Sequence, residues 1–196
     1  MAWNPHAGAR RIAEEWTAQT FSRDPNVVDA VTGMMMMSRE AVVDYMTPLG
    51  LHHIMGDRSE TGSNTASRYA SALAQRNADP RTTPEKLLLW FHRVRWDERM
   101  PSGRTLWQEL IAHYDQGVAG VAEMQARWAA LKPQIDARRH DETAQRLAQQ
   151  YREAVWWRDA CIAYFQSVSG LPLPPGMRAP EHTLDHHKAL QFSFIR

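Results

Sequence analysis

The chain has little of what marks secreted, membrane-spanning or nucleic-acid-binding proteins. Its single cysteine, Cys161, excludes an internal disulfide and a zinc site built from cysteines. No apolar run is long enough to span a bilayer, and the first residues lack the apolar core of a secretory signal. With 23 basic and 22 acidic residues the net charge is +1, which argues against a dominant polyphosphate partner. We therefore expect a cytoplasmic protein with neither a membrane nor a nucleic acid as partner.

The composition itself is that of a folded globular protein. Hydrophobic residues make up 43% and charged residues 23% of the 196 positions, so general disorder is not expected. This length suits one large domain or two small ones, and we predict one domain over residues 1–196. Eight tryptophans is a high count, which indicates either an aromatic core or a sugar-facing surface.

Signals for helices recur along the whole chain. Asn4-Pro5 and Asp24-Pro25 each place a capping residue before a proline at the first helical position. Together with apolar residues at helical spacing, they predict helices over residues 5–21 and 25–47. The same reasoning predicts further helices over residues 67–78, from Thr83 through the apolar run LLLWFHRV, from Leu106 to about Ile135 with a break at Pro133, and from Asp141 to Gly170.

The C-terminal part has a different character. Residues 171–180 contain four prolines and are predicted to run extended over the surface, with a short element after Thr183. Nowhere does an alternating pattern bounded by hairpin turns indicate a sheet. The predicted class is all-α, with about five to seven helices and a proline-rich C-terminal tail.

Histidines form two candidate groups. His52 and His53 lie in a predicted loop with three glycines over residues 50–64, and loops on a rigid scaffold often carry function. His182 and His186 are four residues apart, as in helical metal-binding pairs, with Asp185 and His187 beside them. The sequence specifies no third ligand, so surface histidines are the favoured interpretation and no metal is predicted.

Other clusters favour structural roles. The run Met34 to Met37 is better explained by core packing than by a soft binding surface. Glu40 and Asp44 are interpreted as a common pair of exposed acids on one helix. Asp159 directly follows Arg158 between bulky residues, which favours a partly buried ion pair. Ser-His-Asp, Cys-His and glycine-rich phosphate-loop patterns are all absent from the sequence.

Five stretches taken in order resemble one family. They are WNPHAGARRIAEEWTAQTF, SREAVVDYMTPLGLHHIM, TGSN, TPEKLLLWFHRVRWDERMPSGRTLWQEL and EAVWWRDACIAYFQSVSGLPLP. Together they resemble the C-terminal helical domain of the family 67 glycoside hydrolases, the α-glucuronidases. The resemblance covers the chain from about Trp3 to its end.

The resemblance implies an activity for the whole enzyme. Family members remove glucuronic acid or its 4-O-methyl ether from xylo-oligosaccharides, as inverting hydrolases that need no cofactor. Their catalytic carboxylates lie in a (β/α)8 barrel, which is not matched here, so no catalytic residue is assigned in this chain. The implied partners are that barrel domain and a second copy in a homodimer. The oligosaccharide would be a partner of the full enzyme only.

The sequence departs from the family at one place. Relatives carry a further segment, near the sugar pocket, between the residues that match Met55 and Asp57. The candidate substrate-binding residues that flank this point are His52, His53, Asp57, Arg58 and Asn64. Because the segment is missing here, Arg58 has an alternative role that does not involve substrate. This alternative is a surface ion pair with Asp57 or Glu60.

Three functional readings follow. The first is the non-catalytic domain of an α-glucuronidase, which packs on the barrel and helps to dimerise the enzyme but is inactive alone. The second is a stand-alone helical interaction module derived from that domain. The third is an independent enzyme that uses Glu40, Asp97 or His52. Coding sequence for a barrel upstream of Met1 would separate the first two, and an aldouronic acid hydrolysis assay would test the third.

Overall fold

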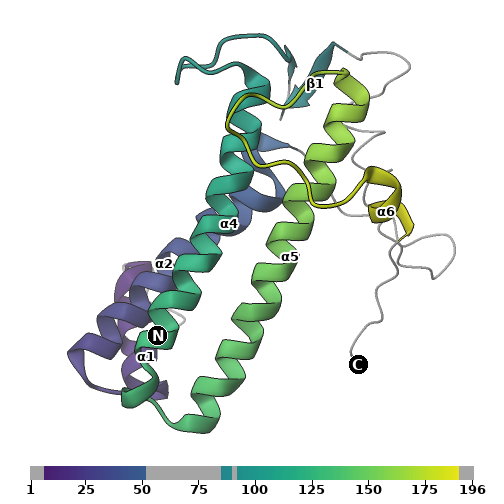
Figure 1. Cartoon of the computed structure of the whole chain (residues 1–196). Helices are drawn as coiled ribbons and strands as arrows, with labels where there is room; N and C mark the ends of the chain where they lie inside the picture. The colour runs from purple at the N-terminus through teal and green to yellow at the C-terminus, as the bar shows by residue number, and fades with distance from the viewer. Residues whose placement is uncertain (1–6, 52–84, 90–91, 190–196) are drawn as a thin grey trace, which may run out of the picture. The chain divides into compact units, whose positions relative to one another are not determined.

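A computed structural model describes residues 7–51, 85–89 and 92–189 of the chain (Figure 1). Its elements are α1 (Ala9–Thr20), α2 (Pro25–Met46), the short helix η1 (Pro48–Gly50), strands β1 (Lys86–Leu89) and β2 (His92–Arg95), α4 (Leu106–Ala130), η2 (Lys132–Gln134), α5 (Ala137–Ser169) and α6 (Leu184–Ala189). The all-α class is confirmed, since the described residues form five α-helices and a single two-stranded sheet. The helix predicted over residues 67–78 lies outside the described residues.

Local side-chain caps explain where three helices begin. The amide of Asn26 donates to Asp24 Oδ1 at 2.8 Å, and Pro25 follows as the first residue of α2. Before α4, the amide of Gln108 donates to Thr105 Oγ1 at 3.3 Å while the amide of Thr105 donates to Gln108 Oε1 at 3.0 Å. This reciprocal pair is a capping box, which satisfies two amides that the helix leaves free. Before α6, Thr183 Oγ1 accepts from the amide of His186 at 3.2 Å.

Two predicted helix starts were wrong. The first helix begins at Ala9 with Gly8 as its cap residue, because residues 7 and 8 are not helical, and not at Pro5. The long helix α5 begins at Ala137 and not at Asp141, because Asp136 Oδ1 already accepts from the amide of Arg139 at 3.1 Å. Its predicted end is confirmed, since Gly170 follows Ser169 with φ of 70°, the left-handed conformation that glycine adopts without strain.

The helix predicted from Thr83 was wrong in kind. Lys86–Leu89 and His92–Arg95 instead form an antiparallel hairpin, with Leu87 opposite Val94. Leu87 and Val94 are buried whereas Arg93 and Arg95 are exposed, so the hairpin buries alternate residues. The alternation of Arg93, Val94, Arg95 and Trp96 was the available signal, and it was hidden behind the continuous apolar run that precedes it.

The chain forms two compact units. The first contains residues 1–42 and 117–154, and the second contains residues 43–116 and 155–196. Residues of α2, α4 and α5 therefore contribute to both units. The prediction of one domain over the whole chain stays a prediction.

The first unit packs around an aromatic series. The ring centroids of Trp16 and Phe21 are 5.5 Å apart, those of Phe21 and Trp128 are 5.4 Å apart, and His140 stacks on Trp128 at 5.6 Å. Trp128 Nε1 also donates to the carbonyl of His140 at 2.9 Å, which ties α4 to the start of α5. Met34 is buried whereas Met35 and Met36 are exposed, which confirms the core role predicted for part of the methionine run.

The second unit holds the larger core. The hairpin packs in it with the first half of α4 and the last half of α5 (Figure 1). Its fully buried side chains include Leu87, Leu106, Leu110, Ile111, Tyr114, Ile162 and Phe165. After α5 the chain runs back without regular structure over residues 170–183, as predicted for the proline-rich tail. Trp107 Nε1 holds this tail by donating to the carbonyl of Pro172 at 3.0 Å.

The described tryptophans lie mostly inside the protein. Trp96 and Trp107 are buried core residues of the second unit. Trp156 and Trp157 of α5 are half-buried, and Trp16 lies on the surface with 46% of its area exposed. Of the two alternatives for the high tryptophan count, an aromatic core accounts for Trp96, Trp107 and Trp128.

Candidate functional site

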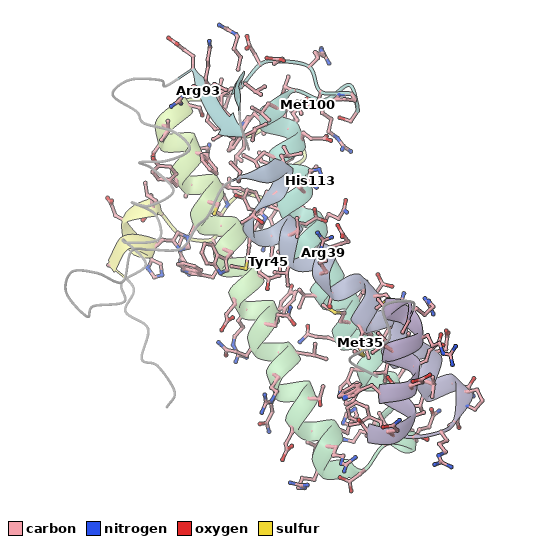
Figure 2. All side chains as sticks on the ribbon, turned by 180° about the vertical axis from the view of Figure 1, so that it is seen from behind. Met35, Arg39, Tyr45, Arg93, Met100 and His113 are labelled. Carbon is pink, nitrogen blue, oxygen red and sulfur yellow. The ribbon has the colours of Figure 1, made fainter. Side chains whose placement is uncertain are left out.

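The first polar cluster joins the end of α2 to α4. We call Asp44, His113 and Glu109 the acid–histidine cluster. Asp44 Oδ1 lies 2.8 Å from His113 Nδ1, and His113 Nε2 lies 3.9 Å from Glu109 Oε1. Figure 2 shows the labelled His113 beside the end of α2, where Tyr45 follows Asp44. The imidazole thus lies between two carboxylates from different helices.

The acid–histidine cluster extends to the turn before α4. Glu109 Oε2 accepts from Ser102 Oγ at 2.8 Å and from Arg104 Nη1 at 3.2 Å. Burial by itself would raise the pKa of Glu109, but these two hydrogen bonds, the positive charge of Arg104 and the electrostatic interaction with the His113 ring hold that pKa below its ordinary value. Glu109 is therefore ionised at neutral pH, which is unsuitable for a general acid that must hold a proton.

Asp44 differs from its predicted surroundings. It was expected to be an exposed acid paired with Glu40, but its residue exposure is 7% and its partner is His113. Glu40 is exposed and pairs with Arg39, its neighbour in the chain. The two acids are thus separated by their environments, because one faces α4 and the other faces solvent.

The second polar cluster is centred on two deeply buried residues of α5, Arg158 and Asp159. We call Arg158, Asp159, Asp115 and Arg178 the arginine network. Arg158 Nε donates to Asp115 Oδ1 at 2.6 Å, and the same guanidinium donates to Asp159 and to the carbonyl of Arg178. Asp159 accepts in turn from Arg178 Nη2 at 3.3 Å and from the amide of Glu181 at 3.0 Å. The ion pair predicted for Arg158 and Asp159 is confirmed, and it anchors the tail.

The other candidate residues belong to neither cluster as defined here. His52, His53, Asp57, Arg58 and Asn64 lie outside the described residues. His182, just before α6, and His186, within α6, are exposed, whereas His187 of α6 is buried. Asp97 is exposed and pairs with Arg95 at 2.9 Å, an arrangement whose hydrogen bond lowers the pKa of Asp97.

The single cysteine is chemically quiet. Cys161 is fully buried in the core of the second unit, and burial raises the pKa of its thiol to about 12. A thiol with that pKa stays protonated at neutral pH and is a poor nucleophile or metal ligand. None of the helices described is long and apolar enough to cross a membrane.

Fold and clusters together define the class as an all-α protein in which Asp44 and Asp159, the buried carboxylates of the described residues, are both hydrogen-bonded. The particular family follows from sequence comparison. Residues 1–57 and 56–178 match the family model described as "Glycosyl hydrolase family 67 C-terminus". The chain therefore belongs to the C-terminal region of glycoside hydrolase family 67, as the resemblance indicated.

Curated relatives agree with this assignment. The chain is 32% identical over 204 aligned positions to "Probable alpha-glucuronidase A" of Aspergillus oryzae, 31% over 205 to "Alpha-glucuronidase" of Hypocrea jecorina and 30% over 205 to "Alpha-glucuronidase A" of Emericella nidulans. These alignments cover 87% or 88% of this chain but only 24% of each relative. The chain thus spans about a quarter of the length of the relatives it matches.

The comparisons also bear on the missing segment. The family match comes in two pieces that meet at residues 56 and 57, where the sequence predicts that a segment is absent. The alignment to the Aspergillus oryzae protein covers 204 positions, more than the 196 residues of this chain, so that relative carries residues without a counterpart here.

Proposed function

We propose that this chain is the C-terminal part of an α-glucuronidase that removes (4-O-methyl)glucuronic acid from xylo-oligosaccharides. In this role it packs on the catalytic barrel, helps the enzyme to dimerise, and is inactive alone. The observation that carries the proposal is the family match over residues 1–178 of a chain that spans only 24% of its relatives.

The polar clusters support the absence of independent catalysis. Inverting hydrolysis needs a protonated acid and an ionised base about 6.5–9.5 Å apart. Glu109 is ionised because Ser102 and Arg104 lower its pKa, and Asp97 is ionised because Arg95 does the same. Asp159 is occupied by Arg158 and by the tail.

An activity assay tests this part of the proposal. The purified chain should release no glucuronic acid from aldouronic acids, whereas the catalytic barrel domain of a relative serves as the positive control. Release at enzymatic rates that is abolished by Glu40→Gln or Asp44→Asn would contradict the proposed inactivity.

Exposed apolar side chains support a packing role. Ile12, Trp16, Met35 and Met36, all in the first unit, expose between 36% and 46% of their surface. Thr17 Oγ1 of α1 lies 4.0 Å from Met35 Sδ of α2, so the two helices that carry these side chains pack together. Apolar surface of this kind favours burial against another domain or a second copy. It equally suits the alternative function, a stand-alone interaction module.

A charge placed on this surface tests the packing role. Trp16→Asp should weaken self-association, or binding of a separately expressed barrel domain, in sedimentation experiments. Gln19→Asp is the matched control, since Gln19 is also exposed on α1. A clean monomer at high concentration that does not bind the barrel domain would remove the packing role while leaving the family assignment intact.

Substrate contact by residues that follow Leu51 in the chain is a separate part of the proposal. His52, His53, Asp57, Arg58 and Asn64 flank the missing segment, and a guanidinium such as that of Arg58 matches the carboxylate fork of a uronate. Glucuronate binding that disappears in Arg58→Ala would support contact, whereas unchanged binding would leave Arg58 as a surface residue. The proposed compartment is the cytoplasm, which cell fractionation tests directly.

A further inference from the structure

Three histidines gather where α6 meets α5 (Figure 1). We call His182, His186 and His187 the histidine cluster. The ring centroids of His182 and His186 are 4.0 Å apart, those of His186 and His187 are 5.8 Å apart, and those of His182 and His187 are 6.1 Å apart. Imidazole is the side chain whose charge changes between pH 5 and 8, so the cluster places three groups that become positive on acidification next to one another.

The surroundings of His187 suit only its uncharged form. The residue is 2% exposed, and neither ring nitrogen has a hydrogen-bond partner among the described residues. An uncharged imidazole already loses free energy in such a place. An imidazolium loses far more, because it carries a full charge and two N–H donors that need acceptors. Protonation of His187 where it stands is therefore strongly disfavoured.

The buried acid that acts on His187 is already occupied. Asp159 attracts a proton to His187 electrostatically. However, Asp159 Oδ1 accepts from Arg158 and from Arg178 Nη2, and its Oδ2 accepts from the amide of Glu181. An imidazolium that recruited Asp159 would have to displace contacts that hold the tail just before α6. Protonation of His187 therefore disturbs the attachment of this region whichever way the charge is accommodated.

The other members of the cluster add charge of the same sign. His182 and His186 are exposed, so water can solvate the charge that each gains on protonation. Burial lowers the pKa of His187, Asp159 opposes that shift, and the neighbouring His186 and His182 add to it. The remaining charged groups of the described elements that meet here are Arg158 of α5, Arg178 and Glu181 of the tail, which pair with each other, and the exposed Asp185 of α6.

Few contacts hold α6 in place. The helix is six residues long. Leu184 packs against the core of the second unit, and the ring of His187 packs edge-on against Trp156 of α5 with centroids 6.3 Å apart. A short element held through so few side chains opens at a lower free energy than the core does.

We propose that α6 is an acid-sensitive latch, docked on α5 while the histidine cluster is uncharged and released when the cluster takes up protons. Release gives water access to both ring nitrogens of His187 and lets the three rings move apart. It also uncovers the face of Trp156 against which His187 packs. The core of the second unit stays folded, so the change is confined to the end of the described chain.

Amide NMR spectra of the full isotope-labelled chain, recorded from about pH 7.5 to about pH 5.5, test the latch. The amides of α6 should move toward the positions of an unstructured chain as the pH falls, while those of α4 keep theirs. For each proton that release takes up, the equilibrium constant for docking should fall about tenfold per pH unit.

The variant His187→Phe separates the charge from the packing. Phenylalanine fills similar space without a titratable nitrogen, so α6 should stay docked over the whole pH range. The matched control is His113→Gln, which changes a histidine outside the cluster and should leave the acid response of α6 as it is in the unchanged chain.

Three results would overturn the proposal. They are amides of α6 that do not respond to acid, a response that His187→Phe retains in full, and amides of α4 that move together with those of α6. The last result would mean that acid unfolds the second unit as a whole. None of these results bears on the α-glucuronidase assignment.

Discussion

The acid–histidine cluster and the arginine network both join distant parts of the second unit, but they do so at different depths. The side chains of Arg158 and Asp159 are 0% and 3% exposed, whereas that of His113 is 29% exposed. A buried charge that loses its partner has no water to replace it, while a half-exposed one does. Depth, more than the number of contacts, therefore decides what each cluster contributes to stability.

The two clusters also connect different elements. The arginine network ties α5 to α4 through Asp115 and to the tail through Arg178 and Glu181. The acid–histidine cluster ties the end of α2 to α4. Breaking the first should loosen the attachment of the tail, and breaking the second should loosen the attachment of the end of α2.

The largest expected effect is the loss of Arg158. Arg158→Met leaves Asp159 buried without its main counter-charge and frees the tail, so the free energy of unfolding should fall by about 3–5 kcal/mol. Chemical denaturation followed by circular dichroism measures it. The double variant Arg158→Met, Asp159→Asn should recover much of the loss, because no charge then stays buried unpaired. Arg138→Ala breaks an exposed ion pair and serves as the comparison. If Arg158→Met lowered the free energy of unfolding by less than Arg138→Ala does, depth would not be decisive.

A smaller effect is expected in the acid–histidine cluster. Asp44→Ala removes the partner of His113 Nδ1, and the half-exposed imidazole can turn to water, so the loss should be about 1–3 kcal/mol. Glu40→Ala on the same helix is the matched control and should change stability little, because Glu40 is exposed. An Asp44→Ala loss as large as that of Arg158→Met would make the two clusters equivalent.

Acidification should separate two groups in the second unit. The pKa values of His187 and Glu109 are lowered in the folded chain, so the unfolded chain binds protons more readily at both. Stability should therefore fall as the pH drops below about 6.5 through His187, and again below about 4.5 through Glu109.

Two variants test which residue causes each of these losses of stability. For each variant the melting temperature is measured against pH, with a chelator present. His187→Gln should flatten the upper window only. Ser102→Ala, which removes one hydrogen bond to Glu109, should weaken the lower window only. A melting temperature constant from pH 7 to pH 5.5 in the unchanged chain would contradict the part assigned to His187, whose charged neighbours are Asp159, His186 and His182.

The smallest effect is expected at the surface of the hairpin. Asp97 pairs with Arg95 by two hydrogen bonds of 2.9 and 3.1 Å, but both side chains are more than half exposed. Asp97→Asn should leave the melting temperature unchanged within error, because water replaces the lost interaction. A clear loss would mean that short hydrogen bonds stabilise this fold whatever their depth.

Sequence patterns predicted most of the fold, and the failures have physical causes. The caps at Asp24 and the stop at Gly170 are local signals, so α2 and the end of α5 were placed correctly. The hairpin was missed because a run of buried apolar residues suits a strand and a helix alike, and only pairing with a second strand decides between them. Trp96 directly follows β2 and is buried in the same core as Leu87 and Val94.

For the polar sites too, contacts between neighbours in the chain were predictable and contacts between distant residues were not. The neighbouring Arg158 and Asp159 predicted an ion pair because adjacent charges among bulky residues are seldom both exposed. The partner of Asp44 and the contact of Asp159 with the tail could not be predicted, since His113 and Glu181 lie 69 and 22 residues away in the chain. Likewise, the i,i+4 spacing of His182 and His186 is visible in the sequence, but the burial of His187 against Trp156 is not.

By itself the sequence determined the helical class, the positions of the main caps and membership of family 67, because these depend on residues that are close in the chain or on whole stretches shared with relatives. Only the tertiary structure decided which charges are buried, that residues 86–89 pair with residues 92–95, and that His187 packs against Trp156. Burial and long-range pairing depend on what the rest of the chain brings to a residue, and that is a property of the packed molecule.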